Sequence, residues 1–325
     1  MKVLIVGCGA VGQVYGLSLQ KAGVTLGYLD RPATAEKIKQ ALEHAGLPIY
    51  QVSHSHRRDP IPHRLEHYQV LTDVAESQRF APDQIWFTIP SQAYYSEWFK
   101  DFLQKVPSER VVCFVPEGAR SEFFPEVGKD RLVFGGTTFM AWQGSLEGGG
   151  GRPEGVNFWL PPLGIPIVGA KSACQDVASL LKKAGFRVTI GKQDSHAQAS
   201  TTALMTAFTV GLELSGWSLR SFRRGPWLKR AAAGAREAVL SQLPGPGAFQ
   251  RVLLWIPLLS AAFYLVTLAL PLIFPFDVEK YLKFHYTKTR EQTLSLLDVF
   301  EKDGKKRGLS VGNIQILLQG LRDSA

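Results

Sequence analysis

Three glycines near the N-terminus have the spacing of a phosphate-binding turn. Gly7, Gly9 and Gly12 form the pattern G-x-G-x-x-G directly after the apolar run Val3–Val6. In such a turn the first glycine allows a tight bend, the second lets the backbone approach a pyrophosphate, and the third lets the next helix pack closely on the strand. The pyrophosphate lies on free N–H groups at the start of that helix, where the helix dipole favours negative charge. The predicted binding turn comprises Gly7, Cys8, Gly9, Ala10, Val11 and Gly12.

The residues after the turn indicate a nicotinamide dinucleotide as its ligand. Apolar residues at helical spacing continue to Ala22, and Val24–Leu29 has the composition of a second strand that ends at Asp30 and Arg31. A carboxylate at this point bonds the ribose 2′-hydroxyl of NAD, whereas a guanidinium pairs with the 2′-phosphate of NADP. The position of Arg31 and the basic charge of the chain favour NADP(H), with NAD(H) as the alternative.

Strand and helix patterns alternate through the first two thirds of the chain, which indicates a parallel sheet. Further strands are expected at residues 84–89, 110–115, 132–134, 156–160 and 187–190, with helices at 94–106 and 172–184. Beyond Lys192 helices are expected almost throughout, at residues 195–219, 226–243, 253–272 and 278–307. We therefore predict an α/β fold in which a Rossmann-type domain (1–192) precedes an all-helical domain (193–325).

The composition fits a globular protein of two domains. A chain of 325 residues exceeds what one hydrophobic core usually organises, and its 45% hydrophobic and 20% charged residues argue against disorder. The net charge of +9 favours anionic partners. The three cysteines are far apart and form no Cys-x-x-Cys pair, so a disulfide framework and a cysteine zinc site are not expected. This pattern favours a reducing, cytoplasmic location.

The segment from His44 to His67 is rich in histidine, arginine and proline. We interpret it as an irregular insertion, because these residues interrupt both strand and helix patterns. Its clustered histidines lack carboxylate partners at ligand spacing, which favours a solvated loop over a metal site. No metal is expected.

Two groups of residues, one at each end of the chain, match a known pattern. The N-terminal group consists of the glycine turn, the Asp30-Arg31 strand end, and the strand Ile85–Ile89 with Pro90-Ser91-Gln92 after it. The C-terminal group consists of Phe276–Leu282, His285–Lys288, Glu291–Thr293, Gly304 and Gly308-Leu309. Together they resemble the ketopantoate reductase family, also called 2-dehydropantoate 2-reductases. The resemblance fades from about Arg220 to Leu270.

The resemblance implies reduction of a small, acidic 2-keto acid by NADPH, with the substrate in a cleft between the two domains. It also adds two cofactor-side positions. The family usually has a lysine beside the cofactor where this chain has Pro90-Ser91, and Asn-Gly near the nicotinamide where this chain has Glu117-Gly118. Ser91 and Glu117 therefore join the predicted cofactor-binding residues.

The catalytic lysine of the family has no counterpart in this chain. The family carries it on the first helix of the second domain, but no lysine occurs between Lys192 and Lys229, and the accompanying asparagines are absent as well. Hydride transfer to a carbonyl places negative charge on oxygen, which a donor or cation must stabilise. The predicted catalytic residues are Lys288, Gln292 and Thr202, with His285, Thr201 and Thr206 as further candidates. Gln292 falls, by spacing from Gly308, where the family has a substrate-binding glutamate.

Each of these candidates also has an ordinary structural interpretation. Lys288 and His285 fit a solvent-facing helix surface, and the threonines can bond to the backbone of their own helix. A catalytic role needs convergent geometry, which spacing does not supply.

An uncharged apolar stretch, Val252–Phe276, lies between Arg251 and Asp277. It is long enough to cross a bilayer, and seven basic residues precede it. Pro257, Pro271 and Pro275 are expected to segment it, which favours a buried helix pair or a homodimer interface over a membrane helix. Membrane association through this stretch stays open as the alternative.

The leading hypothesis is an NADP(H)-dependent oxidoreductase that acts on a small 2-keto acid. The alternative is a non-catalytic dinucleotide-binding protein, such as a membrane-associated redox sensor, because the lysine and the asparagines are missing. Nucleic acid is not an expected partner, since the arginines around Arg223 lack interleaved aromatic residues.

Overall fold

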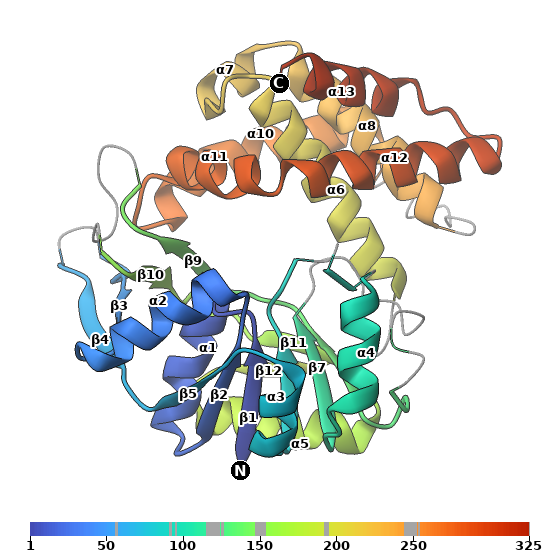
Figure 1. Ribbon diagram of the computed structural model, residues 1–325. Coiled ribbons are helices and arrows are strands. Elements are labelled where there is room, and N and C mark those ends of the chain that lie inside the picture. Colours follow the sequence, from blue (N-terminus) through green and yellow to red (C-terminus); the bar gives the residue numbers. More distant parts are fainter. Residues whose placement is uncertain are drawn as a thin grey trace. The chain divides into compact units, whose positions relative to one another are not determined.

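The protein consists of two compact units (Figure 1). The computed structural model describes residues 1–324 apart from 56–57, 91–92, 95, 115–123, 125–126, 147–153, 192–194, 244–251 and 253. Unit 1 comprises Met1–Ser145 and Gly151–Gln193, and unit 2 comprises Leu146–Gly150 and Asp194–Ala325.

Within its described residues, unit 1 has an eight-stranded sheet at its centre. In spatial order the strands are β12 (Val188–Ile190), β11 (Ile165–Gly169), β8 (Leu132–Gly135), β7 (Arg110–Phe114), β6 (Gln84–Phe87), β1 (Lys2–Val6), β2 (Thr25–Leu29) and β5 (Tyr68–Leu71). Neighbouring strands are parallel except β8 and β11, which are antiparallel. The carboxyl ends of β1, β2 and β6 therefore meet at one edge of the sheet, where the glycine turn lies.

Helices cover both faces of this sheet (Figure 1). The four covering helices are α1 (Ala10–Lys21) and α5 (Lys171–Lys183) on one face, and α3 (Val74–Phe80) and α4 (Glu97–Lys105) on the other. Residues of β1 alternate between the two sides, with Val3 and Ile5 in the first core and Leu4 and Val6 in the second. All four are buried, as expected for a parallel strand covered on both faces. A further helix, α2 (Pro32–Glu43), contacts β5.

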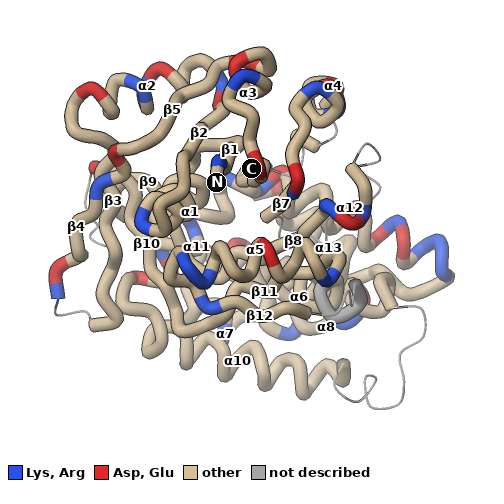
Figure 2. The backbone as a smooth tube through the Cα atoms, turned by 90° about the horizontal axis from the view of Figure 1, so that it is seen from below, with Lys and Arg blue, Asp and Glu red and all other residues tan. Residues whose placement is uncertain are grey.

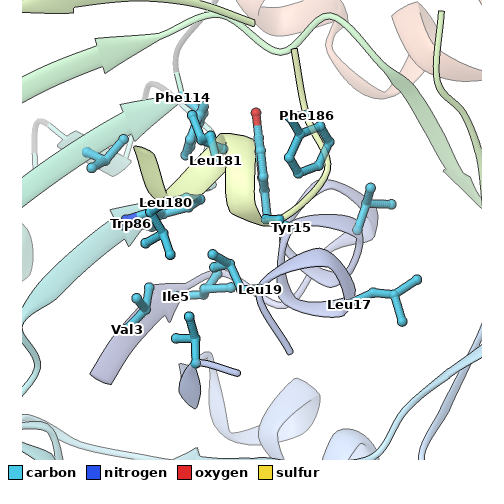
Figure 3. Packing of buried hydrophobic residues seen from close by; sticks show 14 of the residues in the cluster. Val3, Ile5, Tyr15, Leu17, Leu19, Trp86, Phe114, Leu180, Leu181 and Phe186 are labelled. Carbon is cyan, nitrogen blue, oxygen red and sulfur yellow. The ribbon is translucent and has the colours of Figure 1, made fainter. Parts of the chain in front are cut away.

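Aromatic rings fill the core between the sheet, α1 and α5 (Figure 3). Tyr15 of α1 stacks on Phe114 with 4.2 Å between ring centroids, and the edge of one ring meets the face of the other where Tyr15 contacts Trp86. Phe186, which follows α5, lies 5.4 Å from Tyr15 between centroids. These contacts hold α1 against the sheet and so fix the position of the turn that precedes it.

A second sheet contains strands that the sequence did not reveal. Its order is β4 (Ile61–Leu65), β3 (Leu47–Gln51), β10 (Val156–Trp159) and β9 (Met140–Gln143). The interpretation of residues 44–67 as an irregular insertion is therefore wrong for β3 and β4. β3 pairs in parallel with β10, more than a hundred residues away, and antiparallel with β4, and this small sheet contacts α1. The pairing satisfies the backbone of segments whose prolines and histidines had argued against strands.

Unit 2 is helical. Its helices are α6 (Ser195–Glu213), α7 (Leu219–Arg224), α8 (Trp227–Gln242), α10 (Ile256–Ile273), α11 (Val278–Lys288), α12 (Arg290–Lys306) and α13 (Gly312–Asp323). Central α8 contacts α6, α10, α12 and α13. Small residues such as Ala231, Ala232 and Gly234 give it a narrow surface, so that a Cβ on Gly234 would lie 2.5 Å from Leu317 Cδ1. The predicted fold class, a Rossmann-type domain followed by a helical region, is confirmed.

Three expectations for the helical region need correction. The first helix ends at Glu213 rather than at residue 219, and the expected helix 278–307 is two helices that meet at Thr289. The apolar stretch does not form a buried helix pair: its residues 256–273 form one continuous helix, α10, with few buried residues, and its prolines do not divide this helix. Pro257 occupies the first turn, where no N–H is needed, and Pro271 falls in the last turn.

Candidate functional site

The first glycine of the turn has a backbone conformation that favours glycine. Gly7 has φ +101°, and a Cβ there would lie 2.9 Å from Ile89 Cγ2. Its N–H donates to the carbonyl of Leu29 over 2.9 Å, and its carbonyl accepts from Thr88 Oγ1 over 2.7 Å. The turn is thereby joined to the ends of the neighbouring strands β2 and β6.

The other two glycines have opposite surroundings. A Cβ on Gly12 would collide with the carbonyl oxygen of Gly7 and would lie 2.8 Å from Thr88 Oγ1. A Cβ on Gly9 would meet no atom within 4 Å. Gly12 therefore serves close packing of the helix on the turn, whereas Gly9 borders open space on the side from which a ligand can approach.

Helix α1 starts with backbone donors that no side chain caps. Gly9 is its N-cap residue, there is no side-chain cap, and the first turn holds no acidic residue. The first helical bond runs from the N–H of Gln13 to the carbonyl of Gly9, so the N–H groups of Ala10, Val11 and Gly12 precede it. Free N–H groups, a helix dipole and open space at Gly9 fit the pyrophosphate of a dinucleotide.

Asp30 stabilises the turn from the end of β2. Its Oδ2 accepts from the N–H of Cys8 over 2.6 Å, and its Oδ1 accepts from the N–H of Arg31 over 2.7 Å. Burial, and secondly the charge of Asp30, raise the pKa of the Cys8 thiol well above its ordinary value. Cys8 is therefore a neutral, packed part of the turn rather than a nucleophile.

Arg31 lies at the start of α2, next to the turn. It is the N-cap residue of that helix, its side chain is exposed, and the first turn of α2 holds no acidic residue. The guanidinium and the first N–H groups of α2 thus place positive potential beside the end of β2.

Two predicted cofactor-side residues, Ser91 and Glu117, lie outside the described residues. Two residues that the sequence analysis missed support the turn instead. Thr88 bonds to Gly7, and the hydroxyl of Tyr28 donates to the carbonyl of Gly12 over 3.0 Å. The position of Thr88 at the end of a strand was visible in sequence, but the contact with Gly7 depends on the order of strands in the sheet.

The three catalytic candidates belong to three helices of unit 2: Thr202 to α6, Lys288 to α11 and Gln292 to α12. The Lys288 ammonium lies 3.7 Å from the ring centroid of Phe284, and partial burial lowers the pKa of Lys288. Burial, and secondly the nearby charge of Lys288, lower the pKa of His285. Both residues keep exposed surface on α11, as their ordinary structural interpretation expects, and a lysine ammonium at such a surface can donate to a developing oxyanion.

Two contacts join the segment around Lys288 to the C-terminal half of α6. Arg290 Nε lies 3.1 Å from Glu213 Oε1, and the Tyr286 side chain bonds with that of Thr209. Thr202 lies seven residues before Thr209, which is about 10 Å along the helix axis. These contacts fix Tyr286 and Arg290, on either side of Lys288 in sequence, against Thr209 and Glu213, whereas Thr202 lies two turns away on α6.

A surface cavity of about 790 Å³ lies along edge strand β5 of unit 1. Its lining includes Lys2, Lys39, Tyr68 and Arg79. None of the predicted site residues lines it, so the glycine turn and this cavity are separate features.

Comparison with known proteins agrees with this geometry. Residues 3–148 match the family model "Ketopantoate reductase PanE/ApbA". No curated protein matches the chain in sequence.

Solved structures share the fold of the chain. A PanE/ApbA family ketopantoate reductase from Ralstonia eutropha JMP134 has a TM-score of 0.67 at 15% identity, over 99% of this chain and 97% of that one. A 2-dehydropantoate 2-reductase from Geobacter metallireducens GS-15 has a TM-score of 0.64 at 14% identity, over 100% of both chains. D-mandelate dehydrogenase in complex with NADH has a TM-score of 0.66 at 15% identity, over 100% of this chain and 98% of that one.

The structural matches extend beyond the residues that the family model covers. The family model ends at residue 148, while the structural similarity also includes the helical unit. The resemblance inferred from sequence is therefore confirmed: residues 3–148 match the ketopantoate reductase PanE/ApbA family model, and the chain has the fold of ketopantoate reductases and related dehydrogenases.

Proposed function

We propose that this chain is an NADP(H)-dependent oxidoreductase that reduces a small 2-keto acid. The observation that carries the proposal is the glycine turn, in which Gly9 borders open space at an uncapped helix start while Gly12 is packed against Gly7. A purely structural turn has no need of free space at its second glycine. In this proposal residues 1–192 bind the cofactor, and residues 193–325 supply the substrate-binding side chains and the surface for any homodimer.

The bound nicotinamide would supply the hydride, and side chains of the protein would stabilise the oxygen that receives negative charge. Lys288 is the strongest donor candidate, because it is cationic and its segment is joined to α6 through Thr209 and Glu213. Gln292 and the Thr202 hydroxyl supply neutral donors on the neighbouring helices. The carboxylate of a 2-keto acid also suits a chain with a net charge of +9.

Arg31 supports NADP(H) as the cofactor. Both Asp30 oxygens already accept backbone N–H groups, whereas the Arg31 side chain is exposed and, in this proposal, pairs with the 2′-phosphate. D-mandelate dehydrogenase, with the same fold, was solved with NADH, which keeps NAD(H) as the alternative to test.

The alternative function is dinucleotide binding without catalysis. The two asparagines of the chain bond elsewhere: Asn157 Nδ2 donates to the carbonyl of Gly144, and Asn313 Nδ2 donates to Glu237. Neither replaces the asparagines that the family resemblance implies, and this observation favours the alternative.

A single purified sample discriminates the two functions. NADPH and NADH binding would be measured by calorimetry, and oxidation of each by absorbance with a panel of branched and aromatic 2-keto acids. We expect micromolar NADPH binding, on the order of −8 kcal/mol, and turnover of at least one acid. Binding without turnover supports the non-catalytic alternative, and absence of both contradicts the proposal.

The role of Lys288 can be tested once a substrate is found. Lys288→Met should lower kcat by about a hundredfold or more, because it removes a cation from the developing oxyanion. Lys283→Met is the matched control, since Lys283 is an exposed lysine on the same helix. An unchanged kcat in the Lys288 variant assigns the donor role to another residue.

A further inference from the structure

Helix α10 carries an exposed apolar face along its whole length. Among the described residues it is the one helix long and apolar enough to cross a membrane, with a mean hydropathy of 2.1. Leu258, Leu265 and Leu272 recur every seven residues, so they lie on one face, and they are 41%, 62% and 85% exposed. Figure 2 shows α10 without any Lys, Arg, Asp or Glu along its length. Contiguous exposed apolar surface of this kind marks an interaction site.

The opposite face of α10 fixes the helix to unit 2. Leu259, Phe263 and Thr267 are buried there, and the Phe263 ring lies 5.3 Å from that of Phe208 in α6. Arg223 of α7 donates to the carbonyl of Thr267 over 3.1 Å. One face of α10 therefore packs against unit 2, and the face with the three leucines is exposed.

Basic residues flank α10 in the sequence and lie on α7, which contacts it. Between Leu219 and Lys283 there are nine Lys and Arg but only three Asp and Glu, so this fifth of the chain accounts for most of its net charge of +9. Arg220 and Arg224 are exposed on α7, which contacts α10. An apolar stripe beside cationic side chains is complementary to a membrane surface that contains anionic lipid.

We infer that α10 binds the surface of an anionic membrane, lying in the interface with Leu258, Leu265 and Leu272 among the acyl chains. A spanning orientation would bring the buried Thr267 face and its Arg223 contact into lipid. A symmetric homodimer through the same face pairs the surface with itself and would bring the arginines of α7 toward those of a second copy. When α10 lies at the surface of an anionic membrane, the Arg223–Thr267 contact stays out of the lipid and the arginines face opposite charges rather than one another.

The test uses the full chain and vesicles of phosphatidylcholine, with or without phosphatidylglycerol, in a co-sedimentation assay. We expect binding to the phosphatidylglycerol vesicles and release by high salt. Leu265→Glu and Leu272→Glu should each weaken binding about tenfold or more, because each removes a leucine from the apolar phase. Leu163→Glu is the matched control, since Leu163 is an exposed leucine of unit 1, with 59% of its surface exposed.

The electrostatic part is tested with Arg220→Glu and Arg224→Glu. Each should weaken binding to phosphatidylglycerol vesicles about fivefold or more, as expected for a basic residue at an anionic surface. Lys183→Glu, an exposed lysine of α5, is the control and should bind as the original chain does. Circular dichroism of each variant confirms that it is folded.

Three results would overturn the inference. The first is no binding to either vesicle. The second is equal binding to both vesicles with retention after carbonate extraction, which would indicate a spanning helix. The third is a homodimer in light scattering that Leu265→Glu converts to a monomer, without any vesicle binding, because the face would then be covered by a second copy.

Discussion

At the scale of single residues, the glycine turn shows what local spacing encodes. Each of the three glycines meets a different structural requirement. Gly7 has a positive φ, Gly12 lies in close contact with the backbone of the turn, and Gly9 borders open space. These demands are local, so the sequence alone predicted them. The supporting contacts of Thr88 and Tyr28 could not be predicted in this way, because they depend on which strands are neighbours in the sheet.

Substitution of Gly9 tests whether a ligand occupies the open space beside it. Gly9→Val should keep the fold, because a Cβ there meets no protein atom, and should remove measurable NADPH binding, because the side chain enters the pyrophosphate position. Gly312→Val is the control at a glycine with equally free surroundings in unit 2. Calorimetry checks the result, and an unchanged affinity in the Gly9 variant would show that the dinucleotide does not bind this turn.

Arg31 is the residue on which cofactor preference depends. Arg31→Ala should weaken NADPH by about tenfold to a hundredfold and NADH much less, since only NADPH loses a charge-assisted bond to phosphate. Lys37→Ala, at an exposed lysine further along α2, controls for the general loss of positive charge. Dissociation constants for both nucleotides would be compared. An equal loss of affinity for NADPH and NADH would mean that Asp30, rather than Arg31, determines which cofactor is preferred.

At the scale of elements, the sequence predicted those with a periodic local pattern and missed those that long-range pairing creates. Six strands of the large sheet were expected within a few residues of their observed bounds, and so were β10 and the helices α1, α4, α5, α8 and α10. Strands β5, β9 and β11 and the helices α2, α3, α7 and α13 were not expected. β3 and β4 were missed because their partners are each other and β10, and no local pattern reveals such pairing. The end of α11 was missed because the residues around Thr289 are compatible with helix, and the break follows from tertiary contacts of Tyr286 and Arg290 with α6.

A buried carboxylate joins two helices of unit 2. Glu237 of α8 accepts from the N–H of Asn313 over 2.8 Å and from the N–H of Ile314 over 3.0 Å, at the start of α13. Glu237→Ala should lower the free energy of unfolding by about 2–4 kcal/mol, because several charge-assisted bonds are lost and buried donors remain.

Urea unfolding followed by circular dichroism would measure that loss. Glu291→Ala is the comparison, since Glu291 is exposed in the first turn of α12 and should change stability by less than about 1 kcal/mol. Similar losses in the two variants would mean that the bonds of Glu237 contribute little to stability.

At the scale of the whole molecule, the thiols are distributed unevenly between the two units. The three cysteines of the chain are Cys8, Cys113 and Cys174, all in unit 1 and all buried. Cys8 and Cys174 lie in the core on one side of the sheet and Cys113 on the other. Burial is the main cause that raises the pKa of each thiol. The rate at which the thiols react therefore measures the opening of unit 1 and gives no information about unit 2.

We expect the three thiols to react together, and only when unit 1 unfolds. A thiol must reach solvent and ionise before it attacks a reagent, and both cores share one sheet, so partial opening should not expose a single cysteine. NADPH at about a hundred times its dissociation constant should slow the reaction about a hundredfold, because a ligand of the folded state lowers the unfolded population by that factor. The Gly9→Val variant should show no such protection. Mass spectrometry of chains labelled at increasing urea concentration identifies each modified cysteine. Modification of Cys8 well before Cys113 would contradict the expectation, since the glycine turn would then open on its own while the sheet stays folded.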